Sequence, residues 1–157
     1  MVLAVKPISY GGRLATGIDV IGTMKVQGKK QGLIGSSASG AANGWTSLAS
    51  YTQEKKTVIV TRPVDAASPK FSQALNTNEE LTLVVLQLLK KVANGKQVPD
   101  RIVRLTGVVI SKIRRDGPDL TRNGVHLEEV SFTFQAIQIQ NASASTSTTD
   151  DWTAQNQ

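Results

Sequence analysis

The chain contains several short runs rich in β-branched residues, separated by residues that form turns. The clearest runs are Lys56–Arg62, Arg101–Ile113 and Glu129–Gln140, and weaker ones occupy Ile18–Gln27 and Trp45–Tyr51. Runs of this length and composition are typical of β-strands. Five or more such strands in 157 residues predict one mainly antiparallel β domain, arranged either as a barrel or as a sandwich.

One short helix is predicted in this otherwise β-rich chain. Ser68 suits the N-cap of a helix, and Pro69 suits its first turn. Phe71 and Leu75 then share one helical face, and Asn76 is a reasonable end.

The segment 80–92 fits two different structures. Its apolar residues from Leu81 to Val92 recur at helical spacing. The segment also alternates around Leu83, and the Asn94-Gly95 pair behind it is a strong hairpin signal. The residues alone therefore leave helix and strand equally open.

Two of the strand-like runs have an irregular apolar pattern. The apolar residues of Glu129–Gln140 are even-numbered up to Phe134, whereas Ile137 and Ile139 are odd-numbered. A β-bulge near Gln135–Ala136 would shift the parity in this way, and a strand buried on both faces is the alternative. The run 101–113 is apolar on both parities throughout, so we expect one face to fill the core and the other to form a subunit interface.

The charge is divided unevenly along the chain, which carries 18 Lys and Arg against 12 Asp and Glu. All 18 basic residues lie within residues 1–125, together with eight of the acids. The last 32 residues hold four acids and no base: Glu128, Glu129, Asp150 and Asp151. A basic body with an acidic end can bind head to tail with its own copies, and it can equally be a basic domain with a solvating tail.

The residue inventory excludes several kinds of chemistry. The chain has no cysteine and a single histidine, His126, which excludes disulfides, thiolate metal sites and sites with several histidines. The glycine spacing matches neither a dinucleotide fingerprint, nor a phosphate-binding loop, nor a nucleophile elbow. Asp116 and Asp119 flank a proline and are typical of turn residues. We therefore expect no catalytic residue, no cofactor and no metal.

Nucleic acid and membranes are also disfavoured as partners. Four basic pairs occur, namely Lys29-Lys30, Lys55-Lys56, Lys90-Lys91 and Arg114-Arg115. Stacking aromatics would accompany such pairs in an oligonucleotide-binding barrel, but aromatic residues make up only 4% of the chain. No segment approaches the roughly 18 apolar residues of a membrane span. The start of the chain also lacks the pattern of a secretory signal.

Five stretches stand out in order along the chain: MKVQGKKQGLIGS at 24–36, GWTSLASY at 44–51, TRPVDAASPKFSQALNTNE at 61–79, HLEEVSFTFQ at 126–135 and DDW at 150–152. Together they resemble the Hcp family, the tube protein of the bacterial type VI secretion system. The third stretch is the most specific. The family has a strand end there, then an acidic residue, S-P-K and a short helix that ends near T-N-E.

The resemblance implies a mainly β fold, a small antiparallel β-barrel with one short flanking α-helix. It assigns 80–92 to a strand, with a turn at Ala93–Gln97. It divides the chain into an N-terminal arm (1–17), the barrel domain (18–140) and a flexible C-terminal tail (141–157). The family's long glycine-rich loop between the second and third strands is reduced here to Thr52–Lys56. We expect the arm to supply some of the contacts that this loop makes in the family.

The resemblance also implies a function. Family subunits form six-membered rings with an open lumen, and the rings stack into a tube that is fired into a target cell with a spike and effectors. We therefore expect a structural, non-enzymatic subunit whose partners are its own copies and the sheath, spike and effector proteins. It would be made in the bacterial cytoplasm and secreted without a signal peptide. The alternatives are a tube protein of a phage-tail-like contractile injection machine and a basic barrel that binds single-stranded nucleic acid.

Two sets of residues follow from these arguments. The positions that match the family motifs are Gln31, Gly32, Ile34, Gly35, Asp65, Ser68, Pro69, Lys70, His126, Glu128 and Glu129. The candidate subunit contacts are Trp45, Ile102, Val108, Ile110, Asp150, Asp151 and Trp152.

Overall fold

The computed structural model of the chain describes residues 20–35, 44–122, 124–141 and 147–151. In these residues the protein is mainly β, with two antiparallel sheets and one α-helix, α1 (Ser68–Asn76). None of the helices in the described ranges is long and apolar enough to cross a membrane. The predicted arm at 1–17 and Trp152 lie outside the described residues.

The larger sheet contains seven of the described strands, in the order β12–β11–β7–β6–β1–β2, and β3 also pairs with β1. Its strands are β1 (Gly22–Gly28), β2 (Gly32–Ile34), β3 (Thr46–Leu48), β6 (Leu81–Lys91), β7 (Gln97–Thr106), β11 (Ala136–Asn141) and β12 (Ser147–Asp151). Strand β12, which pairs with β11, lies within the segment predicted as a tail.

The smaller sheet runs in the order β4–β5–β10–β8, with β9 paired to β10. Its strands are β4 (Ser50–Gln53), β5 (Thr57–Pro63), β8 (Val109–Arg114), β9 (Thr121–Arg122) and β10 (Val125–Thr133). A short 3-10 helix, η3 (Pro118–Leu120), connects β8 to β9.

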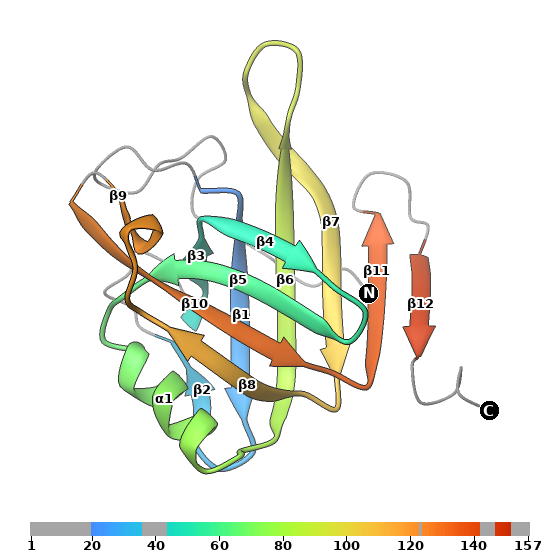
Figure 1. Cartoon of the computed structure of the whole chain (residues 1–157). Helices are drawn as coiled ribbons and strands as arrows, with labels where there is room; N and C mark the ends of the chain where they lie inside the picture. The colour runs from blue at the N-terminus through green and yellow to red at the C-terminus, as the bar shows by residue number, and fades with distance from the viewer. Residues whose placement is uncertain (1–19, 36–43, 123, 142–146, 152–157) are drawn as a thin grey trace.

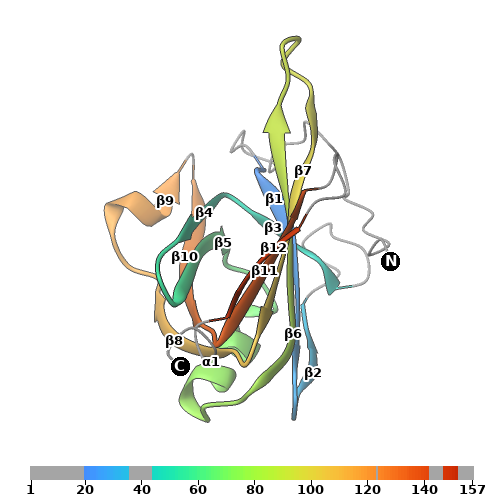
Figure 2. The same ribbon diagram turned by 90° about the vertical axis from the view of Figure 1, so that its right-hand side faces the viewer.

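The two sheets pack face to face, with the strands of the smaller sheet crossing those of the larger one at a steep angle (Figure 1). Figure 2 shows them as two layers, with α1 at one end beside the smaller sheet. The mainly β composition and the single flanking helix are therefore confirmed. The hydrogen-bonded pairing forms two separate sheets, so a closed barrel is not confirmed.

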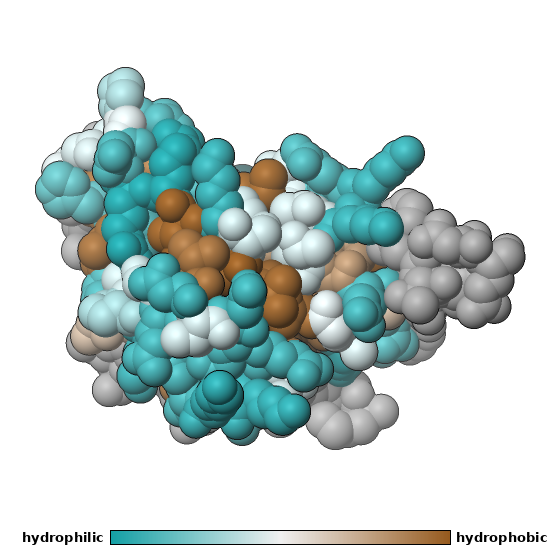
Figure 3. Space-filling view, turned by 60° about the horizontal axis from the view of Figure 1, so that its bottom comes forward, coloured by the Kyte–Doolittle hydropathy of each residue, from teal (hydrophilic) through white to brown (hydrophobic). Residues whose placement is uncertain are grey.

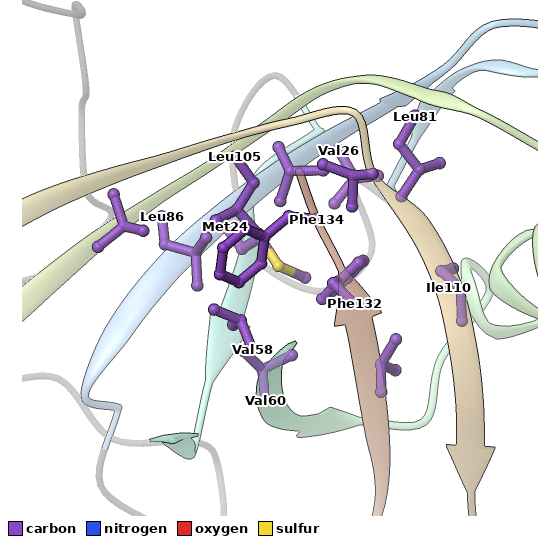
Figure 4. Packing of buried hydrophobic residues seen from close by; sticks show 14 of the residues in the cluster. Met24, Val26, Val58, Val60, Leu81, Leu86, Leu105, Ile110, Phe132 and Phe134 are labelled. Carbon is purple, nitrogen blue, oxygen red and sulfur yellow. The ribbon is translucent and has the colours of Figure 1, made fainter. Parts of the chain in front are cut away.

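The main core lies between the sheets and is set by strand register. On the larger sheet, Met24 pairs with Leu86 and Leu86 with Val103, so one row of inward side chains crosses three strands. Figure 4 shows residues of this sheet facing Val58 and Phe132 of the smaller sheet. Each such side chain contributes about 1.5–3 kcal/mol when it is fully removed from water. The core therefore depends on both sheets being present.

The segment 80–92 is strand β6, as the family resemblance predicted. Its centre is buried on both faces, because residues Val84 through Leu88 alternate between the main core and the outer face of the sheet and are all buried. A strand that is buried on both faces has a continuous run of apolar residues in its sequence. Such a run also contains apolar residues at the spacing of a helical face. This burial on both faces explains why the sequence pattern alone could not distinguish a helix from a strand in this segment.

Three predicted single strands are each divided between the two sheets. Trp45–Tyr51 contains β3 and β4, Arg101–Ile113 contains β7 and β8, and Glu129–Gln140 contains β10 and β11. In each case the first strand belongs to one sheet and the second to the other. The parity change after Phe134 is thus a change of sheet and not a bulge within one strand.

Two of the connections between the sheets, β7–β8 and β10–β11, lie side by side. Gly107, between β7 and β8, has a φ of +64°, which is the left-handed region that favours glycine. Gln135, between β10 and β11, donates its backbone N–H to the Thr106 carbonyl at 2.9 Å. A Cβ at position 107 would lie 2.6 Å from Gln135 Oε1 and 2.9 Å from its Cβ. The two connections therefore fit together only with glycine at this position.

We predict that Gly107→Ala destabilises the fold more than Gly95→Ala does. Both glycines have a positive φ, but nothing lies within 4 Å of a Cβ at Gly95. Left-handed backbone costs an alanine about 1–2 kcal/mol at either site. Crowding against Gln135 adds about 1–3 kcal/mol at Gly107 alone. Urea unfolding of the two variants measures the difference, and equal losses would contradict this account of the connection.

Candidate functional site

Most positions that match the family motifs gather around helix α1. The helix lies at one end of the two layers, close to β2 and β8 (Figure 1). The motif residues there form two polar clusters. One joins the β1–β2 turn to the end of α1, and the other joins the start of α1 to strands β5 and β10.

The first cluster is centred on the carboxylate of Glu79, just after α1. Its Oε2 accepts the backbone N–H groups of Lys30 and Gln31, each at 2.7 Å. The side-chain amide of Gln31 donates to Glu79 Oε1 at 3.0 Å and to the Lys70 carbonyl at 2.9 Å. Four hydrogen bonds thus dock the β1–β2 turn onto the helix, three at Glu79 just after its end and one at Lys70 near its start.

Backbone geometry brings the Glu79 carboxylate to this turn. Asn78 has a φ of +52° and so turns the chain sharply after the helix, a conformation that asparagine tolerates well. Gly28 lies against the Glu79 carboxylate, and a Cβ there would overlap it. Gly32 has a φ of +73° and closes the β1–β2 turn. Gln31 and Gly32 therefore serve this docking contact.

Burial and hydrogen bonding act on Glu79 in opposite directions. Desolvation alone would raise the pKa of its carboxyl group, whereas the hydrogen bonds from Gln31 and Lys30 lower it. The hydrogen bonds outweigh the desolvation, so the pKa of Glu79 lies below its ordinary value. The charged carboxylate is therefore the form that the fold stabilises.

The second cluster surrounds the completely buried guanidinium of Arg62 on β5. Its Nη2 donates to Asp65 Oδ1 at 2.7 Å, its Nε donates to Thr46 Oγ1 at 3.1 Å, and its Nη1 is paired with the Glu128 carboxylate. The ring of Phe71 lies under the guanidinium, at 4.8 Å from its carbon to the ring centroid. Arg62 thus joins both sheets to the start of α1.

Glu128 on β10 is the buried partner in this cluster, and it binds two arginines. Besides Arg62, it accepts from Arg115 Nε at 2.7 Å and from the Ser68 hydroxyl at 2.9 Å. The hydrogen bonds from these donors offset the free-energy cost of removing the Glu128 carboxylate from water. The motif residues Asp65, Ser68 and Glu128, which are up to 63 residues apart in sequence, are therefore parts of one network.

The start of α1 differs from the prediction at one residue. The N-cap is Ala67, which makes no side-chain capping hydrogen bond, and Ser68 is the first helical residue. Ser68 does not cap because its hydroxyl donates to Glu128 and accepts the backbone N–H of Asp65 at 3.0 Å. Pro69 lies in the first turn and Asn76 ends the helix, as predicted.

Glu129, the next residue on β10, takes part in a separate ion cluster at the surface. Both of its carboxylate oxygens lie 3.3 Å from Arg114, which also binds Asp119 at 2.7 and 3.1 Å. The hydrogen bonds that Arg114 donates to Asp119 and Glu129 raise the pKa of Arg114, and the hydrogen bonds from Arg114 lower the pKa of Asp119. Arg114 and Arg115 are thus bound to the protein's own acids, which weakens the case for a nucleic-acid surface.

The remaining motif positions have simpler roles. Ile34 is buried in the main core. Gly35 lies against the backbone of Gly44, where a Cβ would overlap, so it permits a close approach between β2 and the start of β3. The side chain of Lys70 is exposed, and His126 is exposed with its Nδ1 3.5 Å from Thr121 Oγ1.

Within the ranges that the structure describes, no group of three His, Asp or Glu residues could hold a metal.

The candidate subunit contacts lie in three different places. Val108 and Ile110 are enclosed by the main core, because the chain changes sheet at Gly107 and turns both side chains inward. This corrects the prediction, since neither residue retains surface for a neighbouring subunit. Trp45 and Ile102 form a small second cluster with Val85. Asp150 and Asp151 are the last residues of β12.

A shallow cleft lies between α1 and β8. It is lined by apolar Leu75 and Ile113 and by polar residues that include Arg114, Arg115 and Asp116. Figure 3 shows this end of the molecule, where apolar side chains lie in a hollow between polar ones.

Sequence reasoning missed Arg62 and Glu79 as organising residues. Arg62 carried a readable signal, because it follows Val58 and Val60 at the same parity and so had to face the core. Glu128 has the same parity as Val130, and the register places it directly opposite Arg62. A basic and an acidic residue at core-facing positions of two strands therefore indicated a buried pair.

The fold agrees with the comparison to known protein families. A family model described as "Type VI secretion system effector, Hcp" matches residues 19–140. The chain belongs to the Hcp family. The major exported protein of Pseudomonas aeruginosa is 33% identical over 101 residues, which cover 62% of this chain and 59% of that relative. The matched region thus spans little more than half of that relative.

Solved Hcp structures have the same fold. Secreted protein Hcp3 from Pseudomonas aeruginosa superposes with a TM-score of 0.71 at 27% identity, covering 85% of this chain and 99% of that one. A second Hcp protein gives a TM-score of 0.73 at 19% identity over 85% of this chain and 98% of that one, which supports the fold alone. The likeness therefore extends over nearly the whole of both neighbours.

We predict that Glu79→Gln lowers the free energy of unfolding by about 1–3 kcal/mol at neutral pH, because the charge-assisted hydrogen bonds to the β1–β2 turn are weakened. A carboxyl with a lowered folded-state pKa stabilises the fold above its ordinary pKa of 4.5, and this stabilisation is lost as the pH falls. The difference between wild type and variant should therefore shrink below about pH 4.5. The control is Glu80→Gln at the exposed neighbour. A pH-independent difference in chemical unfolding would contradict the assignment.

Proposed function

We propose that this Hcp-family chain is a structural subunit of the type VI secretion tube and assembles with its own copies into a closed ring of six. The observation that carries the proposal is the family match over residues 19–140, together with two sheet edges that are open in the described structure. The polar clusters around Arg62 and Glu79 support a structural role, because their groups bind one another.

The open edges lie at opposite ends of the larger sheet. Among the described strands, β12 pairs on one side only, with β11. At the other end β2 and β3 both pair with β1 and, within the described ranges, with no other strand. Two different edges on one subunit permit a heterologous contact, in which each copy presents one edge to the next. Such a contact forms a ring when the rotation closes.

We also propose a barrel-like closure of each subunit. The chain passes between the two sheets four times, at β3–β4, β5–β6, β7–β8 and β10–β11, and an isolated bridge joins Leu81 of β6 to Val108, next to β8. The Leu81 N–H donates to the Val108 carbonyl at 2.9 Å. This bridge supports a wall that is nearly continuous from one sheet to the other.

The wider role follows from the family. The rings would stack into a tube inside a sheath, below a spike, with effectors carried in the lumen. The chain would be made in the bacterial cytoplasm and leave the cell through the machine itself. The name of the curated relative, an exported protein, supports export as part of this role.

Light scattering coupled to size-exclusion chromatography tests the proposal. We predict a species with six times the 16.8 kDa mass of the chain, because the two unlike edges of the larger sheet close on each other. A protein that remains a single chain at high concentration would refute ring formation.

A further inference from the structure

The outer face of the larger sheet is buried at its centre, although no element of the described residues lies over it. The smaller sheet and α1 both lie on the inner side of the larger sheet (Figure 2). On the outer side, Trp45, Val85 and Ile102 form an apolar cluster separate from the main core, and each is at most 5% exposed. A sheet face without a covering layer would be open to water. This face therefore has an occupant.

Strand register extends the cluster into a row that crosses four strands. Thr23 pairs with Ser47 on one side and with Gln87 on the other, and Gln87 pairs with Ile102. Gln87 follows the core residue Leu86, so the row faces away from the main core. All four side chains of the row are buried. We call this row, together with Trp45 and Val85, the outer patch.

Two polar side chains of the outer patch require a hydrogen-bond partner. Thr23 and Gln87 lie opposite each other and are 3% and 5% exposed. Neither Thr23 Oγ1 nor Gln87 Oε1 has a hydrogen-bond partner among the described residues. Buried polar groups in native proteins are nearly always paired. A polypeptide segment laid over them supplies backbone N–H donors, so the outer patch fits a peptide chain better than a purely apolar ligand.

The segments outside the described ranges differ in the apolar surface that they could bring to this patch. Residues 36–43 have the sequence SSASGAAN and residues 142–146 have ASAST, without a branched aliphatic or aromatic side chain. Residues 152–157 contain one large apolar side chain, that of Trp152. The arm at 1–17 contains seven: Met1, Val2, Leu3, Val5, Ile8, Tyr10 and Leu14. Burial of apolar area therefore favours the arm.

The arm also joins the described structure beside the outer patch. Gln97 Nε2 donates to the Val20 carbonyl at 3.0 Å, and the Leu89 N–H donates to the Ile21 carbonyl at 2.9 Å. These two hydrogen bonds fix the start of β1 against the β6–β7 hairpin, close to Thr23. An extended chain of 17 residues reaches about 50 Å, whereas four strands span about 15 Å. The arm is therefore long enough to cross the whole patch.

We propose that the arm at 1–17 folds back over the outer patch of its own chain. Its apolar side chains pack on the cluster around Trp45, and its backbone N–H groups bind the oxygens of Thr23 and Gln87. The patch is already buried within one chain, so the contact does not need a neighbouring copy and does not rest on the proposed ring. It gives the arm a different role from the expected contact between copies.

Fluorescence of Trp45 in the full-length chain tests the contact. Trp152 is the other tryptophan of the sequence, so Trp152→Phe leaves Trp45 as the single emitter. In this background, the acidic variant carries Val2→Asp, Leu3→Asp and Val5→Asp. The conservative control changes the same three residues to isoleucine. A further variant lacks residues 1–15.

A second control places the same charge in a different segment. It carries Ala38→Asp, Ala41→Asp and Ala42→Asp, which is again three acids, in the segment 36–43 that precedes Trp45. A cooperative urea transition in each variant shows that the fold is retained.

We predict that the acidic variant and the variant without residues 1–15 raise acrylamide quenching of Trp45 at least about threefold and shift its emission to longer wavelength, because the indole loses its apolar cover. Both controls should remain as protected as the parent chain. Unchanged quenching in the variant without residues 1–15 would overturn the proposal. So would a rise that occurs only in the alanine-to-aspartate control, because the segment 36–43 would then be the cover.

Single chains and rings separated by size-exclusion chromatography distinguish the arm from a second copy. We expect Trp45 to be equally protected in both fractions, since the arm belongs to the same chain. Protection confined to rings would show that a neighbouring copy covers the patch and would overturn the proposal. A protein that yields only single chains with a protected Trp45 would support the arm contact and refute the proposed ring.

Discussion

The structure depends on a chain that repeatedly leaves one sheet to enter the other. The pairs β3–β4, β7–β8 and β10–β11 each place successive strands in different sheets, so neither sheet can form without the other. Gly107 and Gln135 show how tightly two of these connections pack. The core between the sheets and the position of α1 follow from this arrangement. The same arrangement makes strand register strict, because a slip of one residue would reverse both faces.

The buried ion pair of Arg62 and Glu128 links strand β10 to the segment between β5 and α1. Strand pairing places the two residues opposite each other at core-facing positions, and Asp65, Ser68 and Arg115 complete their hydrogen bonding. Removing one partner of a buried ion pair typically destabilises a fold by about 3–5 kcal/mol, because the other charge is left uncompensated. The conformation of the segment between β5 and α1 is therefore coupled to β10.

Much of the fold could be read from the sequence, and the failures have a common physical cause. Strand-like composition located the strands, and Asn94-Gly95 marked the turn of the β6–β7 hairpin. Only β6 remained ambiguous, because burial on both faces removed its period-two pattern. The change of parity after Phe134 suggested a bulge or a strand buried on both faces, because a change of sheet leaves the same local pattern. The polar clusters depend on pairing between distant strands, and only the parity of Arg62 and Glu128 hinted at them.

The proposed assembly uses strand pairing between chains, since the larger sheet ends in two unlike edges. Hydrogen exchange of the assembled protein tests this central claim most directly. The account predicts that the outward amides of β12, β2 and β3 exchange at least about tenfold more slowly in the ring than in dissociated chains, because they gain partners there. The amides of β5 and β10, already paired on both sides, should change little. Edge amides that exchange equally fast in both states would contradict assembly through the sheet edges.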